Sequence, residues 1–260
     1  MNLSNISPNS FNDKNRVWLG LMIGNSRLHW GKFQGLQLIE TWDTEHSAFN
    51  ENQDLFLNSV PIIFASVVPQ QTKIWQQYPN VEVITLEQLP LKNLYPTLGI
   101  DRALAVLGAG TKLGFPVLVI DAGTALTFTG CDRDYSLVGG AILPGLGLQF
   151  STLTEKTAAL PQTKFPQHLP QRWARETPGA IQSGIIYTLL AGIQNFIEAW
   201  CQDFPHSQIV LTGGDAHLLM TYIEAKFPAI STQILVVPQV IFWGISAIKR
   251  QQQESTASKK

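Results

Sequence analysis

Two well-separated segments of the chain share the same order of features, and this repeat is what most constrains the fold. "LMIGNSRLHWGKF" at 21–33 contains an apolar strand, a tight glycine turn and a second strand, and "VIDAGTALTFTG" at 119–130 has the same pattern. Each is followed by further strands and then by helix–strand units. A duplication on the scale of a small domain predicts an α/β fold of two similar lobes with a cleft between them.

The composition narrows the class of protein. The chain has 260 residues, of which 45% are hydrophobic, enough to bury a core in one or two domains. A net charge of −1 argues against nucleic acid as a partner, because such binding draws on a basic surface. No apolar run approaches the roughly 20 residues of a membrane helix, and the polar start lacks a signal peptide's apolar segment. We therefore expect a cytoplasmic protein without a membrane anchor.

The composition and the spacing of segments predict the boundaries of the lobes. We expect a disordered arm at 1–16, an N-terminal lobe at 17–107, a C-terminal lobe at 108–250 and a disordered tail at 251–260. Cys131 and Cys201 fit no metal spacing, which favours two reduced thiols. Only 14% of the residues are charged, a weak sign of an interface with a partner.

The two glycine turns are the first candidate site. Gly24 lets the backbone approach a phosphate and Ser26 adds a hydroxyl. Aligned on the glycines, Met22 falls opposite Asp121, which ends an apolar strand. A carboxylate there is expensive unless it meets a cation or hydrogen bonds. The commoner alternative for Asp121 is an Asx-turn that caps Gly123.

Other candidates stand at predicted helix starts. Asp101 and Arg102 follow a glycine turn and begin an apolar helix, where an Asp usually serves as a cap. The functional alternative is that Asp101 accepts a hydroxyl proton while Arg102 pairs with a carboxylate. Thr177 precedes Pro178 and fits a plain N-cap. Trp18, His29 and Trp30 alternate along strands and are expected to be packing residues.

Taken together, the motifs resemble the type III pantothenate kinases of the acetate kinase/actin/Hsp70-like superfamily. The resemblance spans roughly residues 17–248 and rests on segments in the same order throughout: "IGNSRLHWG", "ASVVP", "LGIDRALAV", "IDAGTALTFT", "GGAILPGLGLQFSTLTEKTAALP", "TPGAIQSGIIY" and "VLTGGDAHLL". "LGIDR", "DAGTALTF" and "GGAILPGL" are specific in combination. The resemblance implies an actin-like, ribonuclease H-like duplicated fold.

The resemblance also implies an activity and a set of site residues. The family transfers the ATP γ-phosphate to the primary hydroxyl of pantothenate, the first step of coenzyme A synthesis, and works as a homodimer. Asp101 resembles the general base, and Asp121 the ligand of a potassium or ammonium ion, with magnesium arriving on ATP. The substrate contacts would be Tyr95, Gly99, Ile100, Asp101, Arg102 and Thr177, and the ATP contacts Gly24, Asn25, Ser26, Arg27 and Thr124.

The first motif departs from the family pattern. The first motif of the family usually begins Asp-x-Gly-Asn-Thr, whereas this chain has Met22 in place of the Asp and Ser26 in place of the Thr. Ser26 keeps the hydroxyl, but Met22 can bind neither magnesium nor its waters. Two alternatives therefore stay open: a catalytically impaired nucleotide-binding or regulatory relative, and a kinase of the same superfamily with another acceptor. The presence of Asp101, Arg102, Thr177 and Asp121 together favours an active pantothenate kinase.

Overall fold

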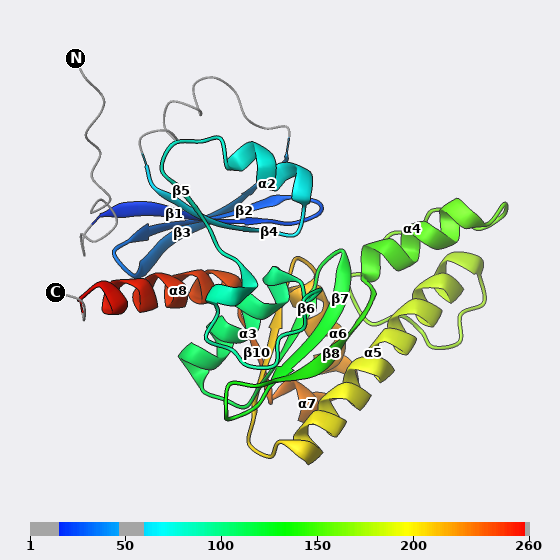
Figure 1. Cartoon of the computed structure of the whole chain (residues 1–260). Coiled ribbons are helices and arrows are strands. Elements are labelled where there is room, and N and C mark those ends of the chain that lie inside the picture. Colours follow the sequence, from blue (N-terminus) through cyan, green and yellow to red (C-terminus); the bar gives the residue numbers. More distant parts are fainter. Residues whose placement is uncertain (1–15, 47–59, 258–260) are drawn as a thin grey trace. The chain divides into compact units, whose positions relative to one another are not determined.

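The computed structural model of the protein describes residues 16–46 and 60–257 (Figure 1). The predicted arm at 1–16 lies outside these residues except for Arg16, as do the last three residues of the predicted tail. The chain divides into two compact units. The first takes the residues up to Pro90, Tyr95–Thr111 and those from Ile241 onward, and the second takes Leu91–Leu94 and Lys112–Val240.

Each unit contains a five-stranded sheet, and the two sheets have the same topology. The first follows the order β3-β2-β1-β4-β5, and its strands are β1 (Val17–Ile23), β2 (Leu28–Gln34), β3 (Gln37–Thr44), β4 (Ile62–Ser66) and β5 (Val81–Val83). The second follows the order β8-β7-β6-β9-β10, and its strands are β6 (Val117–Ala122), β7 (Ala125–Cys131), β8 (Leu137–Pro144), β9 (Gln208–Thr212) and β10 (Ile234–Val236). In both sheets three strands form an antiparallel meander and two more run parallel to its first strand. The predicted α/β duplication is confirmed.

The helices extend the duplication. A helix joins the two parallel strands in each unit and another follows the last strand: α2 (Pro69–Trp75) and α3 (Ile100–Leu113) in one repeat, α6 (Ala216–Lys226) and α8 (Val240–Ala257) in the other. The second repeat adds α4 (Leu146–Lys156) and α5 (Thr177–Asp203) between β8 and β9, and the short α7 (Pro228–Ser231). A 3₁₀ turn, η2 (Leu86–Gln88), precedes α3.

Alternation along β1 divides the core of the first unit between two faces. Leu19, Leu21 and Ile23 pack on one face with Trp30 and Trp75, where the two indoles meet edge to face at 5.4 Å. On the other face, the cross-strand pair Gly20 and Gly31 leaves room for Phe242 of α8. A Cβ added to Gly31 would lie 2.7 Å from the Phe242 ring, so this close approach requires glycine.

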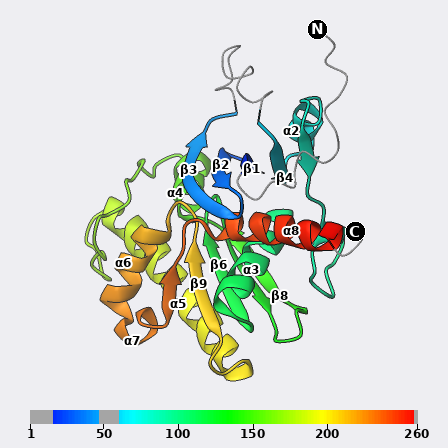
Figure 2. The same cartoon turned by 90° about the vertical axis from the view of Figure 1, so that its left-hand side faces the viewer.

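The last helix therefore belongs to the first unit. An added Cβ on Gly244 of α8 would collide with the backbone of Leu104 in α3, and both views show these helices side by side (Figures 1 and 2). Phe242, Ile245 and Ile248 are buried at helical spacing, which gives α8 an apolar stripe. The prediction of a disordered tail from residue 251 is wrong as far as Ala257, because the polar end of the chain continues this helix. Residues 241–250, which the sequence-based division placed in the C-terminal lobe, lie in the first unit.

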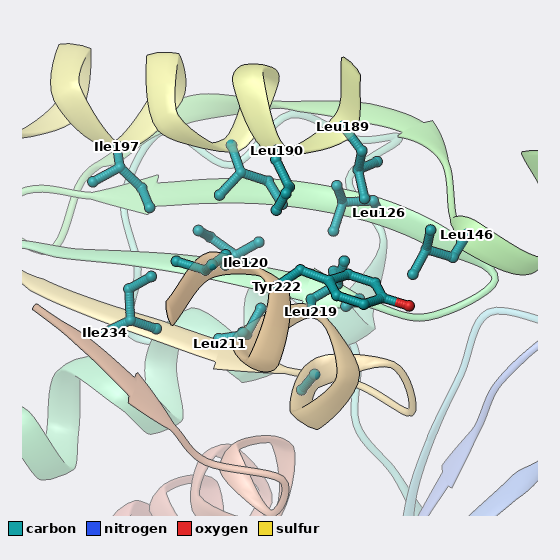
Figure 3. Packing of buried hydrophobic residues seen from close by; sticks show 14 of the residues in the cluster. Ile120, Leu126, Leu146, Leu189, Leu190, Ile197, Leu211, Leu219, Tyr222 and Ile234 are labelled. Carbon is teal, nitrogen blue, oxygen red and sulfur yellow. The ribbon is translucent and has the colours of Figure 1, made fainter. Parts of the chain in front are cut away.

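The core of the second unit forms where α5 and α6 pack on one face of its sheet. Figure 3 shows side chains of these helices meeting Ile120, Leu126 and Leu211 of the strands. Tyr222 of α6 is fully buried and its hydroxyl donates to the Pro166 carbonyl. By length and composition alone α5 is long and apolar enough to cross a membrane, unlike the shorter runs expected from the sequence. Its buried apolar residues lie in this core, however.

Candidate active site

The first glycine turn links β1 to β2. The Gly24 N–H donates to the Arg27 carbonyl at 3.0 Å and closes a turn of four residues. Asn25, Ser26 and Arg27 are exposed on this turn, so a ligand can reach them. The turn between β6 and β7 is one residue shorter, and there the Gly123 N–H donates to the Ala125 carbonyl at 3.1 Å. The two turns occupy equivalent positions in their sheets, but they differ in length.

Strand register places Met22 in the position that Asp121 has in the second sheet. Met22 stands opposite His29 on β2 and Ala65 on β4, and Asp121 stands opposite Thr127 on β7 and Thr212 on β9. Met22 is only 2% exposed. The first sheet therefore has a buried thioether where the second has a carboxylate.

The packing role expected for three residues of β1 and β2 holds for two of them. Trp18 and Trp30 are buried, and Trp18 stacks on Phe33 with ring centroids 4.0 Å apart. For His29 the prediction is wrong. Its side chain is 42% exposed, and its Nδ1 lies 2.8 Å from Asp43 Oδ1. His29 is the second residue of β2, next to the glycine turn at the end of the strand. Strand alternation therefore determines the face on which its side chain lies, but the side chain is not covered there.

The start of α3 brings several predicted substrate residues together. The buried Arg102 donates from Nη1 to the Tyr95 hydroxyl at 3.0 Å, and Tyr95 itself is exposed. Asp101 Oδ1 accepts the Arg102 N–H at 2.8 Å. A Cβ added to Gly99 would collide with the Asp101 carboxylate. Glycine at 99 thus leaves the space that the carboxylate occupies, and Ile100 is buried.

The environment of Asp101 alters its acidity. Burial raises the pKa of this carboxyl above its ordinary 3.8, although the Arg102 N–H and the positive charge of Arg102 oppose the shift. The bond to the Arg102 N–H satisfies one free donor of the first helical turn, which is the capping role the sequence also allowed. A desolvated carboxylate with a raised pKa is also a better proton acceptor than a solvated one. The geometry fits both roles.

In the second unit Asp121 lies among three glycine turns. Its Oδ1 is 3.6 Å from where a Cβ on Gly123 would stand. A Cβ on Gly213, whose φ is +94°, would strike the same carboxylate, and a Cβ on Gly145 would collide with the carbonyl of Gly123. The Gly145 N–H donates to the Thr124 carbonyl at 2.9 Å. These turns pack together only because all three lack side chains.

Asp215 is a carboxylate of this region that the sequence reasoning did not single out. Its N–H donates to the Ala122 carbonyl at 2.9 Å, which fixes the start of α6 against the end of β6. Burial raises the pKa of Asp215 above its ordinary value. The signal was present in "LTGGDA" at 211–216, a third glycine turn after an apolar strand.

Thr177 is the first residue of α5, but it does not cap that helix. The N-cap is Glu176, whose Oε1 accepts the Gly179 N–H at 2.7 Å. The N-cap interpretation of Thr177 is therefore wrong, and its exposed side chain stands one residue inside the helix. The helix begins at Thr177 itself, so the preceding Glu176 is the N-cap and its carboxylate accepts the N–H three residues ahead.

The arrangement of the titratable side chains limits which metal ions the described residues can bind without ligands from a substrate. Within residues 16–46 and 60–257, no three His, Cys, Asp or Glu side chains are grouped so that they could hold a metal ion. Cys131 is buried, and burial raises the pKa of its thiol to about 12, so it is an inert thiol. Any cation bound near Asp121 would need oxygens from the neighbouring glycine turns or from a bound substrate.

Comparisons with known proteins agree on the family. Residues 18–199 match the family described as type III pantothenate kinase. A protein of that name from Nostoc sp. is 48% identical, covering 94% of this chain and 98% of its own length. One from Synechocystis sp. is also 48% identical and covers 91% and 92%.

Solved structures support the fold at much lower identity. A Campylobacter jejuni protein assigned to a Baf family of transcriptional activators superposes with a TM-score of 0.64 at 21% identity, covering 91% of this chain and 99% of that one. The activator of the 2-hydroxyisocaproyl-CoA dehydratase from Clostridium difficile, with bound ADPNP, gives 0.54 at 8% identity, covering 94% and 98%. These similarities concern the fold alone, which is the duplicated actin-like fold.

Proposed function

Since the chain belongs to the type III pantothenate kinase family, we propose that it transfers the γ-phosphoryl group of ATP to the primary hydroxyl of pantothenate. The observation that carries this proposal is the group at the start of α3. Asp101 combines a desolvated carboxylate with a neighbouring Arg102 and an exposed Tyr95. A proton acceptor beside a carboxylate-binding cation suits a substrate with a hydroxyl and a carboxylate.

In the proposed mechanism Asp101 accepts the hydroxyl proton as the oxygen attacks the γ-phosphorus. Phosphoryl transfer depends mainly on positioning and charge stabilisation, so the base needs to be close and ionised rather than strong. Arg102 binds the pantothenate carboxylate through its planar fork, and its bond to Tyr95 fixes the direction of that fork. In this proposal Gly99 and Ile100 line the pantothenate site, and Thr177 contacts pantothenate through its hydroxyl.

The proposed nucleotide contacts come from the two glycine turns. The exposed Asn25, Ser26 and Arg27 meet the phosphates, with Thr124 from the equivalent turn. Backbone N–H groups in such turns bind anions well because glycine lets the chain approach closely. This assignment follows the motif match to the family.

We further propose two cations. The carboxylate of Asp121, set among carbonyl-bearing glycine turns, fits a potassium or ammonium ion, because such ions take oxygen ligands. Magnesium would arrive on ATP, which supplies most of its non-water ligands and neutralises phosphate charge. The buried Met22 does not fit as a magnesium anchor. We therefore assign magnesium to the nucleotide and not to β1.

The remaining parts of the proposal concern assembly. We propose a homodimer that acts in the cytoplasm, with no nucleic acid or membrane as partner. β8 exposes Val138 and Ile142 on the same side of the strand, and exposed apolar side chains of this kind often mark an interface. A second copy of the chain is the proposed occupant.

Met22 supports a second candidate function. A relative that lost its metal acid could bind ATP without turning over, and act as a regulator. The test is an assay of ADP release with and without pantothenate, in potassium, ammonium and sodium, across several divalent metals. We expect release that depends on pantothenate. No release with any metal would favour the non-catalytic relative, and release that does not depend on pantothenate would contradict both candidates; Asp101→Asn serves as the inactive control.

A further inference from the structure

The connection between α4 and α5, residues 157–176, contains no helix or strand, yet it is anchored to the second unit. Four of its carbonyls accept hydrogen bonds from side chains of α5 and α6. The carbonyls and their donors are Lys164 with Gln182 at 3.0 Å, Pro166 with Tyr222, Pro170 with Tyr187 at 2.9 Å, and Arg172 with Ser183 at 2.6 Å. A connection longer than about 12–15 residues without regular structure is uncommon in a compact domain and usually has a function.

The anchored connection holds an aromatic side chain in solvent. Trp173 directly follows the anchored carbonyl of Arg172, and it is 86% exposed, more than any other large hydrophobic residue that the structure describes. An indole in this position adds little to the stability of the fold, because aromatic side chains stabilise a protein through the large area that they bury. A binding partner, in contrast, would gain the whole ring as a contact.

Unpaired positive charge lies beside this indole. Arg172 and Arg175 flank Trp173 in the sequence, at one residue and two residues away. The Arg172 guanidinium lies 4.1 Å from the centroid of the Tyr187 ring, and Nζ of Lys226 on α6 lies 5.9 Å from the same centroid. Among the described residues, none of these three cations forms an ion pair with a carboxylate. A chain with a net charge of −1 thus concentrates positive charge at this place.

We propose that Arg172, Trp173, Arg175 and Lys226, together called the Trp173 surface, bind an acidic protein segment that carries an apolar side chain. The indole covers the apolar side chain, and the cations pair with the carboxylates. Arg172 stacks on the Tyr187 ring, which leaves the N–H groups at the edge of its guanidinium free to donate to a carboxylate. Tryptophan and arginine are also the residues that most often dominate the energy of an interface.

The anchoring of the connection supports this role. A flexible loop loses conformational entropy when it binds, and a backbone that is already fixed avoids much of that cost. The nearest acid in the sequence does not neutralise the surface, because Glu176 Oε1 accepts the Gly179 N–H at the start of α5. The Trp173 surface is therefore both positively charged and ordered before any partner binds.

Charge and composition favour an acidic segment over two other occupants. A second copy of the chain, bound through the same surface about a two-fold axis, would bring the same cations against each other. A lipid surface is bound by segments that insert several apolar side chains. Trp173 is the one large apolar side chain exposed among residues 157–176, all of which the structure describes.

The experiment measures binding of a fluorescent glutamate-rich peptide with a central leucine to the full chain, by fluorescence anisotropy. Trp173→Ala removes the indole, Trp173→Phe keeps an aromatic ring, and Arg172→Gln and Arg175→Gln each remove one charge. Arg133→Gln is the matched control, because Arg133 is an exposed arginine elsewhere in the second unit. Melting curves verify that each variant is folded. The result does not depend on whether the chain phosphorylates pantothenate.

We expect Trp173→Ala to weaken binding of the peptide about tenfold or more, and Trp173→Phe to recover part of the loss. Arg172→Gln and Arg175→Gln should each weaken binding, Arg133→Gln should not, and the affinity of the parent should fall as salt is raised. No binding by the parent, or equal losses in Trp173→Ala and Arg133→Gln, would overturn the inference.

The two other occupants are tested with the same variants. Sedimentation should give the same oligomeric state for the parent and for Trp173→Ala, and a smaller species for the variant would assign the surface to a second copy of the chain. Phosphatidylglycerol vesicles should not bind the parent, and vesicle binding that Trp173→Ala abolishes would assign the surface to a membrane. Either result would overturn the inference.

Discussion

Restoring an acid at position 22 tests what the methionine does. Met22 is 2% exposed, so Met22→Asp removes about 1.5–3 kcal/mol of apolar burial. It also places a carboxylate in a desolvated position, at an effective penalty of several kcal/mol. A charged hydrogen bond with His29, the residue opposite, would return about 1.5–3 kcal/mol. We expect the free energy of unfolding to fall by about 3 kcal/mol near neutral pH.

Magnesium should reverse part of that loss. A ligand that binds only the folded state stabilises it in proportion to its affinity, so magnesium with ATP should raise the melting temperature of the variant more than that of the parent. The magnesium concentration giving half-maximal rate should fall, and the pantothenate requirement should not change. The assays are denaturant unfolding and a magnesium titration against rate.

A double-mutant cycle with His29→Leu completes the design. If the new carboxylate pairs with His29, Met22→Asp should cost about 1.5–3 kcal/mol more in the His29→Leu background. A variant that is less stable, no more responsive to magnesium and additive with His29→Leu would refute the reasoning and mark Met22 as a packing residue alone.

Four further outcomes are expected. Asp101→Asn should lower turnover about 10²–10⁴-fold in steady-state kinetics, yet denaturation should show equal or higher stability, because burial disfavours the charge and raises the pKa of this carboxyl. For the same reason the acid limb of the pH profile of kcat should lie above pH 3.8. The contribution of Asp101 to stability should decline as pH rises from 3.8 through the raised pKa, and Asp101→Asn should abolish this pH dependence of stability. Gly99→Ala should lower kcat with little change in melting temperature, since the added methyl displaces the carboxylate. Rates in sodium should fall well below those in potassium, and Asp121→Asn should remove that difference; equal rates in both cations would exclude the cation role.

Much of the fold was readable because its signals are local. An apolar strand, a glycine turn and an alternating strand occur twice, and the paired topologies of the two sheets follow that order. The destination of the last helix was not readable. The apolar stripe of α8 predicts that the helix packs against other elements, but not which ones. The surface of the first sheet at Gly20 and Gly31, where no side chains stand, is what lets Phe242 pack on that sheet.

The site was predictable where a motif fixes side chains close together in sequence. Asp101 and Arg102 are neighbours, so their contact needed no tertiary information. Asp43 was missed because a lone acid on a meander strand has no distinguishing pattern. Its meaning comes from the register that sets it opposite His29. Glu176 was missed because both it and Thr177 could cap a helix that contains Pro178.

The place of α8 bears on how the protein is made. Domains generally fold during synthesis in the order in which they emerge, the N-terminal one first. Here the second unit has all its residues by Val240, while the first still awaits the helix that covers Gly20 and Gly31. The first unit to be translated is thus the last to be completed. A nonsense codon near the 3′ end of the reading frame would therefore leave the sheet encoded at the beginning of the frame without the helix that covers it.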